Sequence, residues 1–283
     1  MKQASFVGIA AVGMTFVLLT GGIDLSVGAT MYLAPLIAGT MMRDHGLGVG
    51  PALLVALGMG FIIGAVNGFF VVKLKIVPFI VTLSTLFFMR GAGTFLTDSR
   101  QLDFPREMVD FGLWDVLGVP LPILCFVLVV LLGHLILTQT RFGRQLYAVG
   151  NDLEAAKKAG INTDRVIWSV YIINGVLAAL AGFILIAQIG RLDQAFGEGM
   201  EFDVVAAAVL GGASLFGGVG RAYGPMIGAV LIQMVRAGLI YTDVNLYLQP
   251  MAQAAIIFLA VFFDSLRETG IRKLKRRFIR VEA

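Results

Sequence analysis

Long runs of apolar residues alternate with shorter polar intervals along most of the chain. Several of these runs approach the about 20 residues that a helix needs to cross a membrane. The apolar segments cover residues 4–20, 29–42, 50–72, 76–97, 121–139, 167–189, 202–219, 224–241 and 247–264. The pattern predicts an all-α, polytopic transmembrane helix bundle with about nine spans in residues 1–264, followed by a polar tail at 265–283.

Two apolar segments contain a polar interruption bounded by glycines. Gly21–Gly28 reads Gly-Gly-Ile-Asp-Leu-Ser-Val-Gly, and Gly211–Gly218 shares its pattern Gly-Gly-x-Asp/Ser-Leu-x-x-Gly. Irregular backbone at membrane depth is tolerated only where it lines a cavity or is buried in protein. The match has two interpretations. It is a chance result of frequent glycines, or it marks two broken helices of the kind found at transporter binding regions.

The charged residues orient the predicted spans. The interval 98–120 has a net charge of −3, the interval 140–166 has +2, and the tail from residue 265 has +5. Cytoplasmic loops carry the excess of Lys and Arg. We therefore expect 140–166 and the C-terminal tail in the cytoplasm, with the tail on anionic lipid, and 98–120 outside.

The first 42 residues are too long for one straight span and short for two. If they form a hairpin, both interrupted helix pairs run in the same direction and residue 1 lies outside. An external start without a targeting segment is unusual. We therefore expect a further helix upstream, which would bring the number of spans to ten.

The cation-rich interval 140–166 contains a short helix with clear boundaries. Asn151 is the expected N-cap, Glu154 completes a capping box, and Gly160 provides the left-handed stop. The helix offers a small, shallow apolar surface, to which Ala155, Ala156 and Ala159 contribute. An ordinary positive-inside loop and a docking element for a soluble partner both fit these features.

Two charged residues in or between the apolar segments are candidates for a function. Asp24 lies in the first polar interruption, where an ionisable residue is costly unless it is paired or hydrated; it is either functional or, with Ser26, a cap of the resuming helix. Arg90 has three possible roles: to reach outward, to pair with Asp24, or to face a polar pathway. The candidates for a substrate pathway are Asp24, Ser26, Asn67, Arg90 and Ser214.

Composition excludes other classes of protein. The chain is 58% hydrophobic and only 14% charged, so most of it does not face water. Its net charge of +4 does not indicate nucleic-acid binding, because the cations gather in loops and in the tail. A single cysteine, two isolated histidines and the lack of a nucleotide-binding motif predict no catalytic residue, cofactor or metal site. Gly60, Gly64 and Gly68 recur on one helix face, which allows close approach of a neighbouring helix.

Several motifs occur in a recognisable order. They are the Gly21–Gly28 sequence, Val77-Pro-Phe-Ile-Val-Thr-Leu83, Arg90-Gly91, Thr140-Arg-Phe-Gly143, Ala148-Val-Gly-Asn151, Ala155-Ala-Lys-Lys-Ala-Gly-Ile161 and Val209-Leu-Gly-Gly-Ala-Ser-Leu-Phe-Gly-Gly218. From about residue 4 to 263 the chain resembles the permease subunit of bacterial ABC importers for ribose and related monosaccharides. Its most specific motif, Gly21–Gly28, is similar to the sugar branch rather than the branched-chain amino-acid branch. Such permeases usually begin with one more helix.

The resemblance implies a partner set and a mechanism. Two permease subunits, identical or paralogous, would form a pathway in the bacterial cytoplasmic membrane for a pentose or hexose. A periplasmic sugar-binding protein would deliver the sugar, and two ATPase subunits would hydrolyse ATP while docked at Asn151–Gly160. Two other classes stay open: an ion-coupled secondary transporter with Asp24 as its ion site, and a membrane scaffold. The sequence does not name the sugar.

Overall fold

The computed structural model describes residues 2–242 and, beyond them, residues 245, 248, 251–252, 254–255, 258–259 and 262. Met1–Ile232 forms one compact unit and Gln233–Ala283 a second. The helices are α1 Lys2–Leu19, α2 Val27–His45, α3 Val49–Lys73, α4 Pro78–Thr97, α5 Arg106–Leu113, α6 Leu121–Gln139, α7 Arg141–Asn151, α8 Leu153–Lys158, α9 Thr163–Ile189, α10 Met200–Leu210 and α11 Gly224–Tyr241. The strands are β1 Leu102–Asp103, β2 Asp115–Val116, β3 Val119–Pro120 and β4 Arg191–Leu192.

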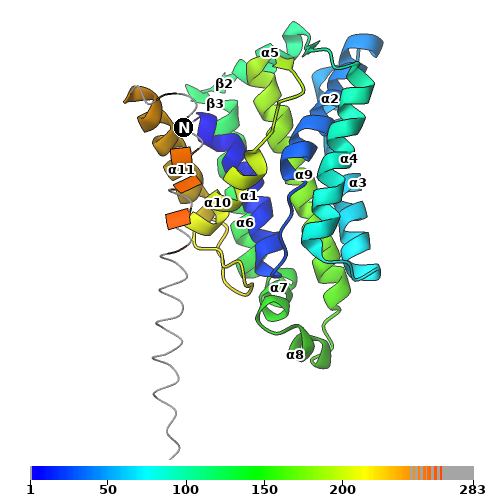
Figure 1. The fold of residues 1–283 in the computed structure, drawn as a ribbon, viewed down its shortest axis with the longest axis vertical. Helices are drawn as coiled ribbons and strands as arrows, with labels where there is room; N and C mark the ends of the chain where they lie inside the picture. Colours follow the sequence, from blue (N-terminus) through cyan, green and yellow to red (C-terminus); the bar gives the residue numbers. More distant parts are fainter. Residues whose placement is uncertain are drawn as a thin grey trace, which may run out of the picture. The chain divides into compact units, whose positions relative to one another are not determined.

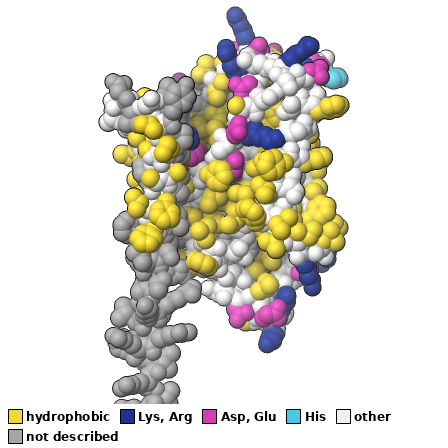
Figure 2. Space-filling view, viewed as in Figure 1, with side chains coloured by type: hydrophobic (Ala, Val, Ile, Leu, Met, Phe, Trp, Pro, Cys, Tyr) yellow, Lys and Arg dark blue, Asp and Glu magenta, His cyan; other side chains and the backbone are white. Residues whose placement is uncertain are grey.

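Six helices among the described residues are long and apolar enough to cross a membrane: α1, α3, α4, α6, α9 and α11. The most apolar stretch of α1 is 89% buried and that of α9 is 72% buried, against 22–33% for α3, α4 and α6. α1 and α9 therefore form the centre of the bundle. The outer helices keep apolar surface exposed, and Figure 2 shows hydrophobic side chains over the middle of one face with most charges towards its two ends. This distribution is typical of a protein surrounded by lipid.

α3 packs directly against α9 along its row of glycines. A methyl group at Gly60 would collide with the carbonyl oxygen of Gly175, and one at Gly64 with the carbonyl oxygen of Tyr171. Such close backbone approach gains dispersion contacts along the whole interface, since lipid itself is as apolar as leucine. The predicted role of these glycines in helix packing is confirmed.

The acidic and basic intervals lie at opposite ends of the bundle. α5 and the β2–β3 hairpin lie at one end, whereas α7 and α8 lie at the other end, together with the connection from α3 to α4 (Figure 1). The β1–β4 pair is antiparallel, with Leu102 opposite Leu192, and links the α4–α5 connection to the segment after α9. The arrangement agrees with the separation of the two intervals that their charges predict.

The structure corrects three predictions of element boundaries. The segment 202–219, counted as one span, contains α10, which ends at Leu210, followed by a glycine-rich loop at the interruption Gly211–Gly218. The interval 140–166 holds α7, α8 and the start of α9 rather than one short helix. The fold is mostly helical but adds four strands of two residues each in the described part. The segment 247–264 and the tail at 265–283 lie largely or wholly outside the described residues, so the count of nine spans stays a prediction.

Candidate functional site

The chain leaves the helical conformation between the end of α1 and the start of α2. Gly21 adopts a left-handed conformation with φ of 73°, and the next residues run from the end of α1 back into the bundle (Figure 1). Asp24 and Ser26, which lie in this break, are each only 1% exposed. The break therefore carries a carboxylate into the protein interior, where it needs hydrogen-bond donors.

Three donors surround the Asp24 carboxylate, and all of them are neutral. Oδ1 accepts hydrogen bonds from the Ser26 backbone N–H at 2.8 Å and from the Ser26 hydroxyl at 2.5 Å. Oδ2 accepts one from Nδ2 of Asn174 on α9 at 2.8 Å. Asp24 thus accepts from the backbone amide of Ser26, the N-cap residue of α2, and also ties this end of α2 to the central helix α9. Both roles predicted for it, capping and a buried polar function, are compatible with this geometry.

The hydrogen bonds continue from Ser26 to two further helices. Nδ2 of Asn67 on α3 donates to the Ser26 hydroxyl at 2.9 Å, and its Oδ1 accepts from the Thr85 hydroxyl on α4 at 2.7 Å. We call Asp24, Ser26, Asn67, Thr85 and Asn174 the Asp24 network. It joins α2, α3, α4 and α9 at one point. Because Asp24, Ser26 and Asn67 are buried, they line no open pathway in this conformation.

Two buried polar atoms beside the network have no hydrogen-bond partner among the described residues: Oδ1 of Asn174 and the hydroxyl of Tyr171. A methyl group on Gly13 would lie 2.7 Å from the first, and one on Gly22 would lie 2.7 Å from the second. Buried polar groups usually find a partner, in protein or in water. One acceptor without a partner in the described part of the chain therefore lies beside the interior of α1, and one such hydroxyl lies beside the turn that follows α1.

Arg90 takes part in a different contact. Its Nη1 donates to the carbonyl oxygens of Phe196 at 2.6 Å and Gln194 at 3.1 Å, and its guanidinium lies 5.1 Å from the ring centre of Tyr32. Of the three roles considered for Arg90, pairing with Asp24 is therefore wrong. The residue fastens the segment between α9 and α10 to α4.

Glu201, at the start of α10, is a buried residue that the sequence reasoning missed. Its Oε2 has no hydrogen-bond partner among the described residues, and a methyl group on Gly28 would collide with it. The available signal was an acidic residue at the edge of an apolar segment. No group of three or more His, Cys, Asp or Glu in the described part of the chain is placed to hold a metal ion.

Ser214 lies in the second break and repeats one local feature of the first. Its hydroxyl accepts a hydrogen bond from the Phe216 backbone N–H at 3.2 Å, as Asp24 does from Ser26 two positions further on. The backbone differs, because Gly211 has φ of −73° where the matching Gly21 has 73°. The two breaks therefore share a turn contact but not a conformation, and Ser214 has no hydrogen bond to the Asp24 network.

The short helix α8 begins one residue later than predicted. Asp152 is its N-cap and accepts from the backbone N–H groups of Glu154 and Ala155, each at 2.9 Å, whereas Asn151 is the last residue of α7. Asp152 has the extended conformation that an N-cap requires, with φ of −159° and ψ of 106°. The Glu154 carboxylate accepts from Lys157 at 3.2 Å, so the predicted capping box is wrong.

The three alanines predicted to form a docking surface differ in their exposure. Ala156 is buried, whereas Ala155 and Ala159 are exposed, as are Asn151, Glu154 and Gly160. Gly160 follows the helix with φ of 82°, the left-handed conformation predicted for a stop. α8 therefore rests on the rest of the chain through Ala156 and leaves small side chains on its outer surface.

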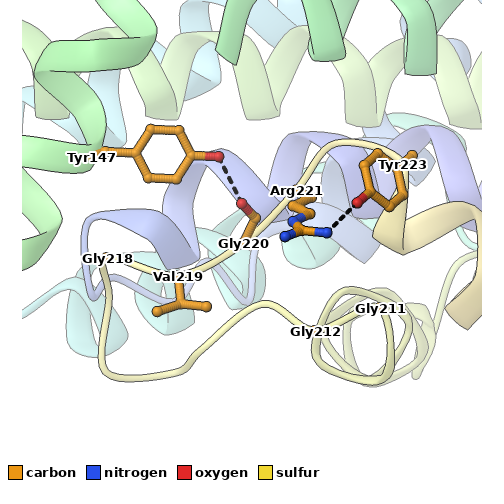
Figure 3. A pocket seen from close by; sticks show the side chains of 8 residues that line it. All are labelled: Tyr147, Gly211, Gly212, Gly218, Val219, Gly220, Arg221 and Tyr223. Carbon is orange, nitrogen blue, oxygen red and sulfur yellow. Dashed lines mark hydrogen bonds between the residues drawn. The ribbon is translucent and has the colours of Figure 1, made fainter. Parts of the chain in front are cut away.

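A pocket of about 570 Å³ adjoins the second break (Figure 3). It is lined by Tyr147, Gly211, Gly212, Gly218, Val219, Gly220, Arg221 and Tyr223. The Tyr147 hydroxyl donates to the carbonyl oxygen of Gly220 at 2.7 Å, and Arg221 donates to the Tyr223 hydroxyl. Burial raises the pKa of the Tyr147 phenol, so its hydroxyl keeps its proton and stays a donor at neutral pH.

Comparison with known proteins assigns the family. Residues 1–261 match the family model described as the permease component of the branched-chain amino acid transport system. The chain is 37% identical to the ribose import permease protein RbsC of Haemophilus influenzae, over 97% of this chain and 85% of that protein. It is 34% identical to the D-allose transport system permease protein AlsC of Escherichia coli, over 93% of this chain and 81% of that protein. It is 32% identical to the xylose transport system permease protein XylH of the same organism, over 94% and 83%. No solved structure gives a significant match.

These matches and the apolar helices define an integral membrane protein of the permease class. The chain belongs to the family of permease subunits of bacterial ABC importers, within which its relatives include the ribose, allose and xylose permeases. The resemblance predicted from the sequence motifs is confirmed.

Proposed function

We propose that the chain is the membrane-spanning subunit of an ATP-driven importer and carries a monosaccharide of the pentose or hexose class into the bacterial cytoplasm. The observation that supports this most strongly is the extent of the similarity, which covers 93–97% of the chain in ribose, allose and xylose permeases. The chain itself catalyses no reaction in this proposal. It binds no cofactor, and a partner subunit hydrolyses the ATP that drives transport.

The same proposal assigns partners to the two ends of the bundle. A periplasmic sugar-binding protein meets the end that carries α5 and the β2–β3 hairpin, and the ATPase subunits dock at α8. A second permease subunit, identical or paralogous, completes the pathway, and membrane lipid covers the outer helices. In this arrangement the C-terminal tail is cytoplasmic, in line with its net charge.

In this proposal the Asp24 network holds the first helix break against α3, α4 and α9. It holds four helices together while the pathway is closed, because all five members are hydrogen-bonded to one another and all but Thr85 are buried. Opening of the pathway then requires some of these bonds to be exchanged. Asp24, Ser26 and Asn67 become available to sugar hydroxyls only at that stage, while Arg90 contributes from α4 and Ser214 from the second break.

An ion-coupled secondary transporter with Asp24 as the ion site is the less favoured alternative. The relatives named above are permeases of transport systems for sugars, and the Asp24 carboxylate already accepts three hydrogen bonds from neutral donors. A site that awaits a cation would keep its carboxylate oxygens free. The two possibilities differ in their source of energy.

Reconstitution tests the proposal. The chain is expressed with candidate ATPase and periplasmic sugar-binding subunits from the same organism. The complex is purified, and uptake of labelled ribose, allose and xylose into proteoliposomes is measured. We expect uptake of at least one monosaccharide. This uptake should require ATP on the side of the membrane that carries the ATPase subunits, and a proton or sodium gradient should not change it. Uptake driven by either gradient without ATP would overturn the proposal in favour of the secondary transporter.

A further inference from the structure

The C-terminal end of α7 contacts both helix breaks at once. Gly150, the penultimate residue of α7, approaches the backbone so closely that a methyl group there would collide with the carbonyl oxygen of Leu19, the last residue of α1. The same methyl group would lie 2.7 Å from the backbone nitrogen of Gly218 in the second break. Only glycine permits this approach of three backbone segments.

Direct hydrogen bonds join the same segments. The backbone N–H of Gly218 donates to the carbonyl oxygen of Leu19 at 3.0 Å, so the second break is bonded to the end of α1. One turn earlier on α7, the Tyr147 hydroxyl donates to the carbonyl oxygen of Gly220 at 2.7 Å. We call the contacts among Tyr147, Gly150, Leu19, Gly218 and Gly220 the α7 junction.

The α7 junction adjoins α8 through the end of α7 and adjoins the first break through Leu19. Asn151 ends α7, its side chain reaches towards Gly218, and the next residue, Asp152, caps α8. On the other side, Leu19 is followed by Gly21 and then by Asp24 itself. A displacement of α8 therefore has a short route to the first break, through the end of α7, Leu19 and the turn that follows it.

The second break has the means to move. Gly212, Gly217 and Gly218 adopt left-handed conformations with φ of 90°, 89° and 74°. The pocket of about 570 Å³ shown in Figure 3 lies beside this loop, so it can shift without displacing a packed helix. The first break, by contrast, is buried and held by the Asp24 network.

We propose that Tyr147, Gly150 and Gly218 are positioning residues that convey the movement of docked α8 to both helix breaks together. The inference rests on the proposed function, in which an ATPase docks at α8. Gly150 transmits force because its backbone is in direct contact with α1 and with the glycine loop. Tyr147 keeps that loop attached to α7 while it moves into the space of the pocket. Transport and ATP hydrolysis thereby stay coupled.

The test separates coupling from docking. The full complex is prepared with Gly150→Ala, with Tyr147→Phe, and with Gly58→Ala as the matched control, since a methyl group at Gly58 meets nothing within 4 Å. Three quantities are measured: co-purified ATPase, ATP hydrolysis with and without sugar-loaded binding protein, and sugar uptake per ATP hydrolysed. Gly150→Ala should keep co-purification and basal hydrolysis but lower uptake per ATP about tenfold, as expected if a coupled step is hindered by roughly 1.4 kcal/mol. Tyr147→Phe should lower it less, and Gly58→Ala should not change it.

Several results would contradict the proposed role of Gly150 and Tyr147. Unchanged uptake per ATP in both Gly150→Ala and Tyr147→Phe would overturn the assignment of positioning residues. Loss of co-purified ATPase in Gly150→Ala would also overturn it, because the residue would then act on docking. If Gly150→Ala does not accumulate in the membrane, Tyr147→Phe decides alone, since it removes one hydroxyl and keeps the ring. Failure of the unaltered chain to co-purify with an ATPase would instead reject the proposed function.

Discussion

Nδ2 of Asn174 donates to Oδ2 of Asp24 over 2.8 Å, although 150 positions separate the two residues in the chain. The bond connects the first helix break to the central helix α9, and both residues are at most 1% exposed. This long-range contact holds the break against α9.

Exchange of the two side chains should test the pair directly. In Asp24→Asn the new amide group faces the amide of Asn174, and a buried donor loses its acceptor at a cost of about 1–3 kcal/mol. Adding Asn174→Asp restores one donor opposite one acceptor, so the double variant should regain part of the lost melting temperature in detergent. Thr85→Val, which removes only the outermost hydrogen bond of the network, is the milder control. A double variant no more stable than Asp24→Asn would contradict the pairing.

Transport should respond to Asp24 in graded fashion. Asp24→Leu removes every acceptor and leaves the donors of Ser26 and Asn174 buried without partners, so sugar uptake should be abolished while the protein still inserts. Asp24→Asn keeps one acceptor oxygen for Ser26 and should retain part of the uptake. Uptake in proteoliposomes, normalised to inserted protein, gives the comparison. Normal rates in both variants would show that Asp24 has no role in transport.

The close packing of α3 on α9 predicts opposite effects of two similar substitutions. Gly60→Ala forces a methyl group against the Gly175 carbonyl and should lower stability by about 1–3 kcal/mol. Gly58→Ala on the same helix meets open space and should be neutral or slightly stabilising, because alanine favours helix more than glycine. Thermal unfolding of the purified variants in detergent measures both. Equal effects would argue against backbone contact between the helices.

The outer surface of α8 predicts which residues a docked ATPase would contact. Ala159→Arg adds bulk and a charge at the exposed C-cap residue of α8 and changes no residue inside the helix, so insertion should be normal and ATPase co-purification lost. Lys157→Gln should be much milder, because a peripheral charge contributes little to affinity. If Lys157→Gln is the more severe change, the interval acts through its charge and the docking interpretation fails.

Orientation can be tested by labelling from each side of the membrane. With Cys125 replaced by serine, a new cysteine at exposed Asp110 should react with an impermeant reagent in intact cells. A cysteine at exposed Lys157 should react only after permeabilisation, because the cation-rich interval belongs on the cytoplasmic side. Reaction of both from the same side would reject the predicted orientation and the docking site with it.

The helices and the first break follow from patterns that a sequence displays locally. Apolar runs of sufficient length place α1, α3, α4, α6 and α9 within a few residues, since the membrane demands that length. Asp24 between two glycines is a polar break that only buried or cavity-lining backbone tolerates. The four-residue spacing of Gly60 and Gly64 likewise indicates a close helix interface, although it does not name α9 as the partner.

The remaining features depend on contacts between distant segments or on choices of nearly equal energy. Asn67 and Asn174 meet Ser26 and Asp24 only once α3 and α9 are packed, and no local pattern pairs them. Asn151 and Asp152 are comparable N-caps, so the sequence places the start of α8 with an uncertainty of one residue. The structure decides for Asp152 because α7 continues through Asn151.

The Asn174–Asp24 bond also has a consequence for the order of biosynthesis. The ribosome makes residue 24 long before residue 174, and domains assemble from the N-terminus onward as the chain emerges. Until α9 has entered the bilayer, the carboxylate of the first break lacks one of its donors, and burial in lipid at that stage would be costly. The segment after α1 therefore has to wait near the translocon or at the water interface. We therefore expect it to reach its final depth only once α9 has arrived, so that the membrane integration of the first helices depends on a later one.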